Sequence, residues 1–289
     1  MVLLYICRNK ITEMKKIILL FVMFLIASST FAQKKLSIKG SKIVSIQKKE
    51  VAFFDAIEVQ DGLEITLVKG EKSGVELEAD DNLQDAIGLS INGNTLVISS
   101  LKNVYGFKKF NIRVTYTNNF KSVTAKNKSV VNVMEEMVLD EITFKSFDDA
   151  KFYLNLNVKS FQLIANDASR IEMNLKADNT DIQLNNGSEL KALIASNAIK
   201  CDLYQKSKAN IEGDCIVIKL RLDNNSKFIG NKLTAKSMKL IAEAYTNSIV
   251  FAETNLELEA SGNAEIDLYG SPQIDVKKFA DSAIISKKM

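Results

Sequence analysis

Acidic side chains are the residues of this chain whose types and spacing best fit a catalytic role. Two carboxylates within roughly 5–10 Å of each other can hydrolyse a glycosidic bond, so acids that converge in a groove predict a carbohydrate-active enzyme. Each candidate also fits a solvated corner or surface position, and we favour this second interpretation, which predicts no catalytic residue. The candidate groups are Asp148 with Asp149, Asp167 with Arg170, and Asp178 with Asp181.

Histidine is absent from all 289 residues. Its absence removes the usual general base, the Ser-His and Cys-His nucleophile pairs, and the commonest zinc and copper ligand. The sequence also has no CxxC pair for a structural metal, and no phosphate loop, nucleotide fingerprint, EF-hand or nucleic-acid motif. We therefore predict a protein without enzymatic activity, cofactor or metal site.

Four tyrosines are the candidates for contact with a partner. Outward aromatic rings can stack on sugar rings or fill a pocket of a protein partner. Exposed Tyr on a strand can equally reflect β-propensity alone, which is the simpler explanation. The candidates are Tyr153, Tyr204, Tyr245 and Tyr269.

The N-terminus is typical of a secretory signal peptide over residues 1–32. Lys15 and Lys16 precede an apolar run from Ile17 to Ile26, which is too short to span a bilayer. We expect translation to start at Met14 and cleavage to follow Ala32. Cleavage there leaves no net charge, so no field favours nucleic acid or an anionic membrane. The expected location is the periplasm or the cell surface.

Cysteine usage after the leader is limited to Cys201 and Cys215. An exported protein can form a disulfide, but one pair of thiols does not define a framework. Cys201 falls in an apolar column of the repeat described next, so we favour a buried free thiol, and a bond between the two cysteines stays open.

From residue 121 onward the sequence repeats, mostly at intervals of 19–22 residues. A small residue anchors each unit, and apolar residues stand two places after it and six and eight places before it. Even offsets are apolar and odd offsets largely polar, which is the alternation of a strand with one buried face. The anchors are Ser129, Ala150, Ser169, Ser188, Ser207, Ser226, Ser248 and Ala264.

Two places before each anchor stands a corner residue, most often Asn or Asp, which tolerates positive φ at a bend. Such units bury their apolar faces by stacking on one another, and Asn and Asp can hydrogen-bond along the stack. We favour a β-solenoid over an antiparallel meander or sandwich, because the columns keep one register. The corner residues are Asn127, Asp148, Asp167, Asn186, Gln205, Asn224, Thr246 and Gly262.

The predicted organisation is a polar leader (33–50) followed by one β domain (51–289). Residues 51–119 are strand-rich, with turns at Asp61-Gly62 and Asn92-Gly93 and a capped single turn from Asp80 to Gln84. Residues 120–270 form the stacked rungs, and residues 271–289 cap the last rung or contact a second subunit. The apolar residues of that cap are Ile274, Val276, Phe279, Ile284 and Ile285.

Several motifs carry a resemblance to a known family. They are F-x-x-I-x-V from Phe54, the D-G turn after it, V-E-x-E-A-D-D-N-L, N-G-x-x-L-x-I, and the ending LYGSP. With these, residues 51–285 resemble the putative auto-transporter adhesin, head GIN domain family of exported proteins, found mainly in Bacteroidetes. The corners depart from the Gly-rich turns of the family, since this chain has NDAS, NNGS and DNNS.

The resemblance implies a right-handed parallel β-helix-like fold in the periplasm or on the cell surface, and it carries over no catalytic residues. The function that we expect is binding of an unknown protein or glycan, without catalysis. The alternatives are a carbohydrate-active β-helix enzyme and a structural, oligomerising scaffold.

Overall fold

The computed structural model describes residues 35–289, and residues 38–289 form one compact unit. The predicted signal peptide and the start at Met14 lie outside the described residues. The described chain is almost entirely β-strand, with one short 3-10 helix, so the expected scarcity of helices is confirmed for residues 35–289. Across the same range, no helix is both long enough and apolar enough to span a bilayer.

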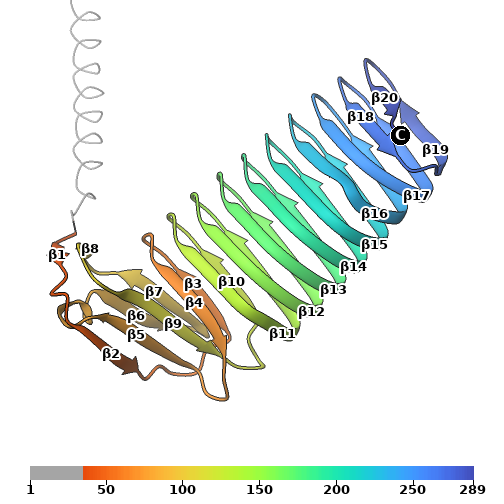
Figure 1. Ribbon diagram of the computed structural model, residues 1–289. Coiled ribbons are helices and arrows are strands. Elements are labelled where there is room, and N and C mark those ends of the chain that lie inside the picture. Colours follow the sequence, from red (N-terminus) through yellow and green to blue (C-terminus); the bar gives the residue numbers. More distant parts are fainter. Residues whose placement is uncertain (1–34) are drawn as a thin grey trace, which may run out of the picture. The chain divides into compact units, whose positions relative to one another are not determined.

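A stack of parallel strands makes up most of the fold (Figure 1). Each central rung is one long strand, paired in parallel with the strands of the rungs before and after it. The predicted β-solenoid is therefore confirmed. Its strands are β10 (Ser122–Ala125), β11 (Val130–Ser146), β12 (Lys151–Ala165), β13 (Arg170–Leu184), β14 (Glu189–Leu203), β15 (Lys208–Leu222), β16 (Lys227–Ala242), β17 (Asn247–Ala260) and β18 (Glu265–Tyr269).

Each long strand has two arms separated by a bend. In β12 the first arm covers residues 151–158, the pairing with β13 is interrupted at Lys159, and the second arm covers residues 160–165. Buried and outward side chains alternate along both arms, so each arm contributes one face to a shared core. We use the terms first arm and second arm for the same halves of the other rungs.

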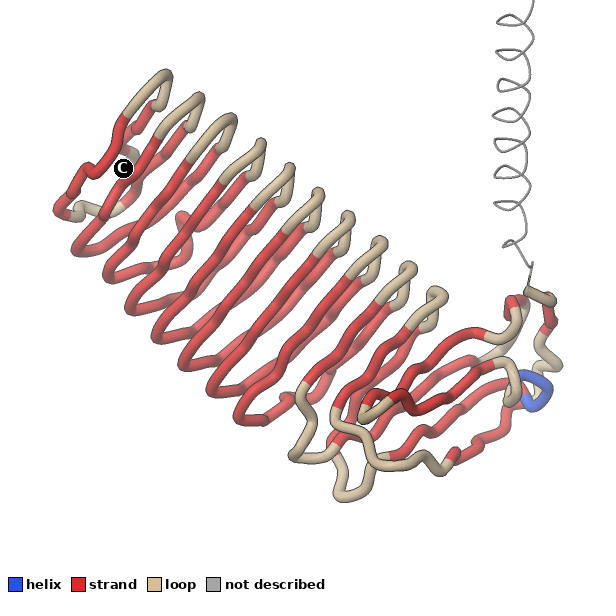
Figure 2. Tube along the Cα trace, turned by 180° about the vertical axis from the view of Figure 1, so that it is seen from behind, coloured by secondary structure: helices blue, strands red, loops and turns tan. Residues whose placement is uncertain are grey.

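The turns between rungs stack along one side of the solenoid (Figure 2). Asp167 and Ala168 both have positive φ, at 55° and 58°, and the amide of Ser169 donates to the carbonyl of Asn166 at 3.2 Å, as in a type I′ turn. The amide of Ala168 also donates to the carbonyl of Asn186 in the next rung, at 3.0 Å. The Asn186 side chain donates to Oδ1 of Asp167 at 3.0 Å, which confirms the predicted ladder of corner side chains.

One predicted anchor is wrong. Ser248 pairs with Phe228, which stands two places after the anchor of its own rung, and the positive φ of this turn belongs to Ala244, not to Thr246. The anchor of this unit is therefore Thr246. A slip of two residues leaves every side chain on its own face, so period-two alternation could not reveal the error.

The stack begins earlier than the repeat predicts. β3 (Ala56–Val59) pairs in parallel with β10, and β4 (Glu64–Lys69) pairs in parallel with the first arm of β11. Asp61 and Gly62 have positive φ in the turn between β3 and β4, and Leu63 takes the anchor position. The first rung is therefore the D-G turn segment, which a long insertion separates from the second.

The insertion and the leader form the strand-rich cap, whose elements are β1 (Ser37–Lys39), β2 (Val44–Lys49), β5 (Gly74–Asp80), η2 (Asp81–Leu83), β6 (Ile87–Asn92), β7 (Thr95–Ser100), β8 (Asn103–Tyr105) and β9 (Phe110–Tyr116). β7 and β9 continue the stack in parallel with β3 and β4. β6 and β5 then pair antiparallel with β7 and β9, which completes the hydrogen bonding of these two strands. Leu96 and Ile98 of β7 are fully buried inside this cap.

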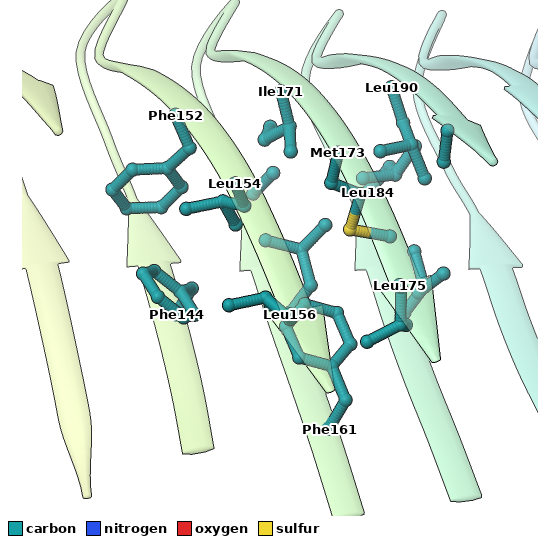
Figure 3. Packing of buried hydrophobic residues seen from close by; sticks show 14 of the residues in the cluster. Phe144, Phe152, Leu154, Leu156, Phe161, Ile171, Met173, Leu175, Leu184 and Leu190 are labelled. Carbon is teal, nitrogen blue, oxygen red and sulfur yellow. The ribbon is translucent and has the colours of Figure 1, made fainter. Parts of the chain in front are cut away.

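The opposite end of the stack is formed by β19 (Gln273–Phe279) and β20 (Ile284–Lys287), which pair in parallel with β17 and β18. Between the two ends, a continuous apolar core runs along the inside of the rungs. The rings of Phe144 and Phe152 meet edge to face with centroids 5.2 Å apart, and Phe161 lies 6.2 Å from Phe144 (Figure 3). Stacking therefore buries large side chains that no single rung could cover.

The helix η2 corresponds to the capped turn predicted from Asp80 to Gln84. Asp80 holds the N-cap position but makes no side-chain hydrogen bond to the helix. Its carboxylate instead accepts the backbone amides of Lys42, Lys108 and Lys109, at 2.8–3.2 Å. This acid therefore joins three segments of the cap and does not serve as a helix cap.

Candidate functional site

A shallow hollow on the outward face of the first arms is the candidate site. It has a volume of about 470 Å³ and spans β12 to β15, with one contribution from β11. Exposed apolar side chains, amides and charged groups all contribute to its lining. The residues are Met134, Tyr153, Leu154, Asn155, Glu172, Met173, Asn174, Lys191, Ala192, Leu193, Asn210 and Glu212.

Irregularities in strand pairing lie on both sides of the hollow. In β11, residues 134–136 stand opposite one residue of β12, which leaves Met134 71% exposed at the side of the hollow. In β16, residues 230–232 stand opposite two residues of β15, and Lys232 of this bulge forms an ion pair with Glu212 at 3.2 Å. β-Bulges re-aim side chains and often border functional sites. Regular rungs thus form the floor, and irregular rungs form the two sides.

Tyr153 supplies an accessible aromatic ring to this hollow and is 38% exposed. Leu193, two rungs further along the stack, is 54% exposed. Their outward direction follows from their register, because both occupy odd offsets from the anchor while the even offsets fill the core. The floor therefore offers apolar surface to a ligand.

Apart from Glu212, the polar side chains of the hollow are free to bind a ligand. Within residues 35–289, Asn155, Asn174, Glu172, Lys191 and Asn210 make no side-chain hydrogen bond or ion pair. The column beside them differs, because Glu189 there pairs with both Arg170 and Lys208. The amide and carboxylate groups around Tyr153 therefore present unused donors and acceptors.

The paired column runs along the edge of the hollow nearest the turns. The Glu189 carboxylate lies 4.0 Å from Nε of Arg170 and 3.2 Å from Nζ of Lys208. These groups line a second hollow of about 440 Å³, which shares Glu172, Lys191 and Asn210 with the first. The two hollows together make a groove that crosses the strands along the stacking direction.

The structure does not bring the four predicted tyrosines together. Tyr153 lies in the hollow, whereas Tyr269 is half-buried on the same kind of outward position six rungs away, in β18. Tyr204 and Tyr245 lie in turns between rungs, where Tyr245 is 67% exposed. Partial burial, with the nearby charge of Asp202, raises the pKa of Tyr204.

The candidate acids do not converge on a reaction centre. Asp167 accepts from the Asn186 amide, and Arg170 faces Glu189 in place of Asp167. Asp178 accepts from the Asn197 amide at 3.1 Å, while Asp181 pairs with Lys200 at 3.4 Å. Asp148 and Asp149 both lie in a turn with positive φ. Within the described chain, no group of three or more His, Cys, Asp or Glu residues could hold a metal ion.

A wider trough of about 760 Å³ follows the bends of β11 to β15. Lys159 pairs with Asp140 at 2.8 Å in it, and no aromatic side chain lines it. Because many of its polar groups already bind one another, this trough has fewer free groups to offer a ligand than the hollow at Tyr153.

Both cysteines of the solenoid are buried free thiols, as we favoured for Cys201. Cys201 pairs with Leu220 of the next rung and Cys215 pairs with Ser196 of the previous one. Burial raises the pKa of both thiols, that of Cys215 to about 12. Neither thiol is suited to act as a nucleophile, because the thiolate is the reactive form.

The sequence matches the model of the putative auto-transporter adhesin, head GIN domain family over residues 53–193 and 170–272. The chain belongs to this family. The match covers the first rung, the part of the cap that follows residue 53 and the stacked rungs, and the resemblance read from the motifs is confirmed. No curated protein matches this head GIN domain.

Solved structures share its fold. A putative adhesin from Parabacteroides merdae ATCC 43184 is 14% identical with a TM-score of 0.62, over 88% of this chain and 99% of that one. A putative adhesin from Parabacteroides distasonis ATCC 8503 is 16% identical with a TM-score of 0.63, over 87% and 100%. A putative lipid binding protein from the same organism is 14% identical with a TM-score of 0.59, over 88% and 100%. At these identities the likeness establishes the fold alone.

Proposed function

We propose that this head GIN domain is an exported, non-catalytic binding protein that recognises a glycan in the hollow at Tyr153. The family supports an adhesion-type role, and the observation that supports this site is the combination of an exposed ring with free polar groups. Tyr153 and Leu193 offer apolar surface, while Asn155 and Asn174 offer unused amides. Sugars combine an apolar ring face with hydroxyl groups, so this lining matches them on both counts.

The groove formed by the two hollows runs along the stacking direction, and this direction favours an extended ligand. The hollow crosses four successive rungs, so equivalent positions recur along it at the spacing of neighbouring strands, about 4.8 Å. A chain molecule can contact the same column at each rung. A polysaccharide therefore suits this surface better than a small, compact solute.

A glycan array tests the proposal. Residues 33–289 should bind at least one immobilised oligosaccharide, and Tyr153→Ala should weaken binding by about tenfold or more, because it removes the aromatic platform. Tyr245→Ala is the matched control, since this tyrosine is exposed but lies in a turn outside the hollow. Binding to no glycan, or equal losses for both variants, would overturn the proposal.

Export is tested separately. We propose that residues 1–32 are removed as a signal peptide, so the protein recovered from the cell envelope should begin at Gln33 when analysed by intact mass. A mature protein that retains Met14 or Met1 would contradict this part of the proposal.

A further inference from the structure

The C-terminal end of the solenoid leaves its last rung incomplete. Ile274 pairs with Leu256 and Val276 pairs with Leu258, so both continue inward columns of the core. Leu256 and Leu258 are 1% exposed, whereas Ile274 is 44% exposed and Val276 is 53% exposed. The difference arises because no further rung covers the last one within the described residues.

The backbone at this end is also unpaired on one side. β19 pairs with β17 only and β20 pairs with β18 only, so the outer edge of each strand has no backbone partner in residues 35–289. The other end differs, since β6 and β5 pair with the strands β7 and β9 there. Within residues 35–289, the stack therefore has an unpaired strand edge at its β19 and β20 end, whereas antiparallel strands pair with the opposite end.

We propose that a second copy of this chain covers this end, through antiparallel pairing of β19 with its own counterpart. Two identical edges related by a two-fold axis pair antiparallel and close the assembly, which a head-to-tail contact does not do. The proposal goes beyond glycan binding and does not depend on it.

Charges along β19 select one register. β19 bulges at Lys277, because Val276 pairs with Leu258 while Lys278 pairs with the next residue, Glu259. When the axis passes at Val276 and Lys277 stays out of the pairing, Val276 stands opposite its own counterpart, Asp275 of each copy opposite Lys278 of the other, and Ile274 opposite Phe279. Opposite charges that face each other across strands stabilise pairing, and like charges destabilise it. A parallel in-register contact would place both Lys277 and Lys278 against their own counterparts. The sequence of the strand therefore favours the antiparallel arrangement.

Dimerisation through β19 would also raise the avidity of the protein for a surface that displays glycans. Each copy carries its own hollow on β12–β15, so a dimer presents two sites on one particle. Two linked sites bind a surface that displays many glycans more strongly than either site alone. The dimer is thus a means of raising avidity without a new contact to the glycan.

Sedimentation velocity of residues 33–289 over a range of concentrations tests the dimer. The unchanged protein should form a dimer, and Val276→Asp should raise the dimer dissociation constant by about tenfold or more, because it places a carboxylate in the apolar contact. Ile216→Asp is the control, since Ile216 is equally exposed at 53% but lies in β15, away from this end. Circular dichroism should show the same strand content in all three proteins.

Charge reversal tests the register. Lys278→Asp should weaken the dimer, and the double variant Asp275→Lys with Lys278→Asp should restore it, because opposite charges then face each other again. A monomer at every concentration, a dimer that survives Val276→Asp, or a double variant no better than Lys278→Asp would overturn the proposal.

Discussion

Asp80 and Lys42 are 38 residues apart in sequence, yet Oδ2 of Asp80 accepts the backbone amide of Lys42 at 2.8 Å. The same carboxylate accepts the amides of Lys108 and Lys109, and Asp80 has no exposed surface. Burial alone would raise the pKa of Asp80, but these three amides outweigh it, and the pKa lies below its ordinary value of 3.8. One acid thus holds the leader against the inserted strands of the cap.

Replacing this acid should destabilise the cap. Asp80→Asn should lower the melting temperature by several degrees at pH 7, because an amide cannot accept the same set of hydrogen bonds. The folded pKa is the lower one, so the stabilisation by the carboxylate is complete above the ordinary value and is lost as pH falls through the folded pKa. Thermal unfolding followed by circular dichroism from pH 7 down to pH 2 should show the difference shrink below pH 3.8.

Asp81→Asn is the control for that measurement, because Asp81 is exposed and accepts from the exposed Ser41 hydroxyl. It should change the melting temperature far less than Asp80→Asn. Equal effects of the two variants, or an Asp80 effect that does not depend on pH, would show that the carboxylate does not act as described.

The contribution of the anchor serines to the free energy of unfolding should differ from rung to rung. The Ser169 hydroxyl donates to the carbonyl of Asn166 at 2.5 Å, whereas the Ser207 hydroxyl has no partner among the described residues. Ser169→Ala should therefore cost about 1 kcal/mol in free energy of unfolding, and Ser207→Ala should be neutral or slightly stabilising. Urea unfolding of the two variants checks this, and a larger loss for Ser207→Ala would refute it.

A glycine lies where regular pairing between β15 and β16 resumes after the bulge, because Gly213 pairs with Leu233. Gly213 has φ of 117°, and a Cβ atom there would lie 2.0 Å from the carbonyl oxygen of Ile194. Gly213→Ala should therefore cost at least about 2 kcal/mol in free energy of unfolding. Gly74→Ala is the matched change, since nothing lies within 4 Å of its added Cβ, and it should cost under about 1 kcal/mol. Similar unfolding midpoints for both variants in urea would contradict this account.

The buried thiols should resist modification. Cys201 is fully buried and Cys215 is 6% exposed, and the raised pKa of Cys215, about 12, keeps it protonated at pH 8. A chain that begins at residue 33 should react with Ellman's reagent at both thiols in urea and at neither when folded. Rapid modification of the folded protein, or fewer than two thiols in urea, would contradict the assignment.

The register of the rungs was largely predictable from the sequence, because each position in a rung sees the same environment in the next. Small anchors, corner residues and bulky columns follow from this. The exception at Thr246 has a physical cause, since a slip of two residues to Ser248 preserves the alternation. The repeat did not predict the first rung at Leu63, because the inserted cap strands separate that rung from the second one.

The hollow was only partly predictable. Tyr153 could be identified from the sequence as an outward aromatic residue. Its position on a strand, in contrast to Tyr204 and Tyr245 in turns, depends on where the turns fall. The residues that line the hollow with it come from other rungs. A sequence signal did exist, because the unit from Ser129 to Ala150 is 21 residues long instead of 19. The surplus forms the bulge that exposes Met134. Longer units in such repeats therefore indicate where to look for a site.

A crystal structure of residues 33–289 with the oligosaccharide selected on the array is the most direct test of the proposed site. We expect a sugar ring against Tyr153, with hydroxyl groups bound by the side chains of Asn155 or Asn174. A sugar seated on the second arms, on the turns around Tyr245 or at the β19 end, with the hollow empty, would contradict it.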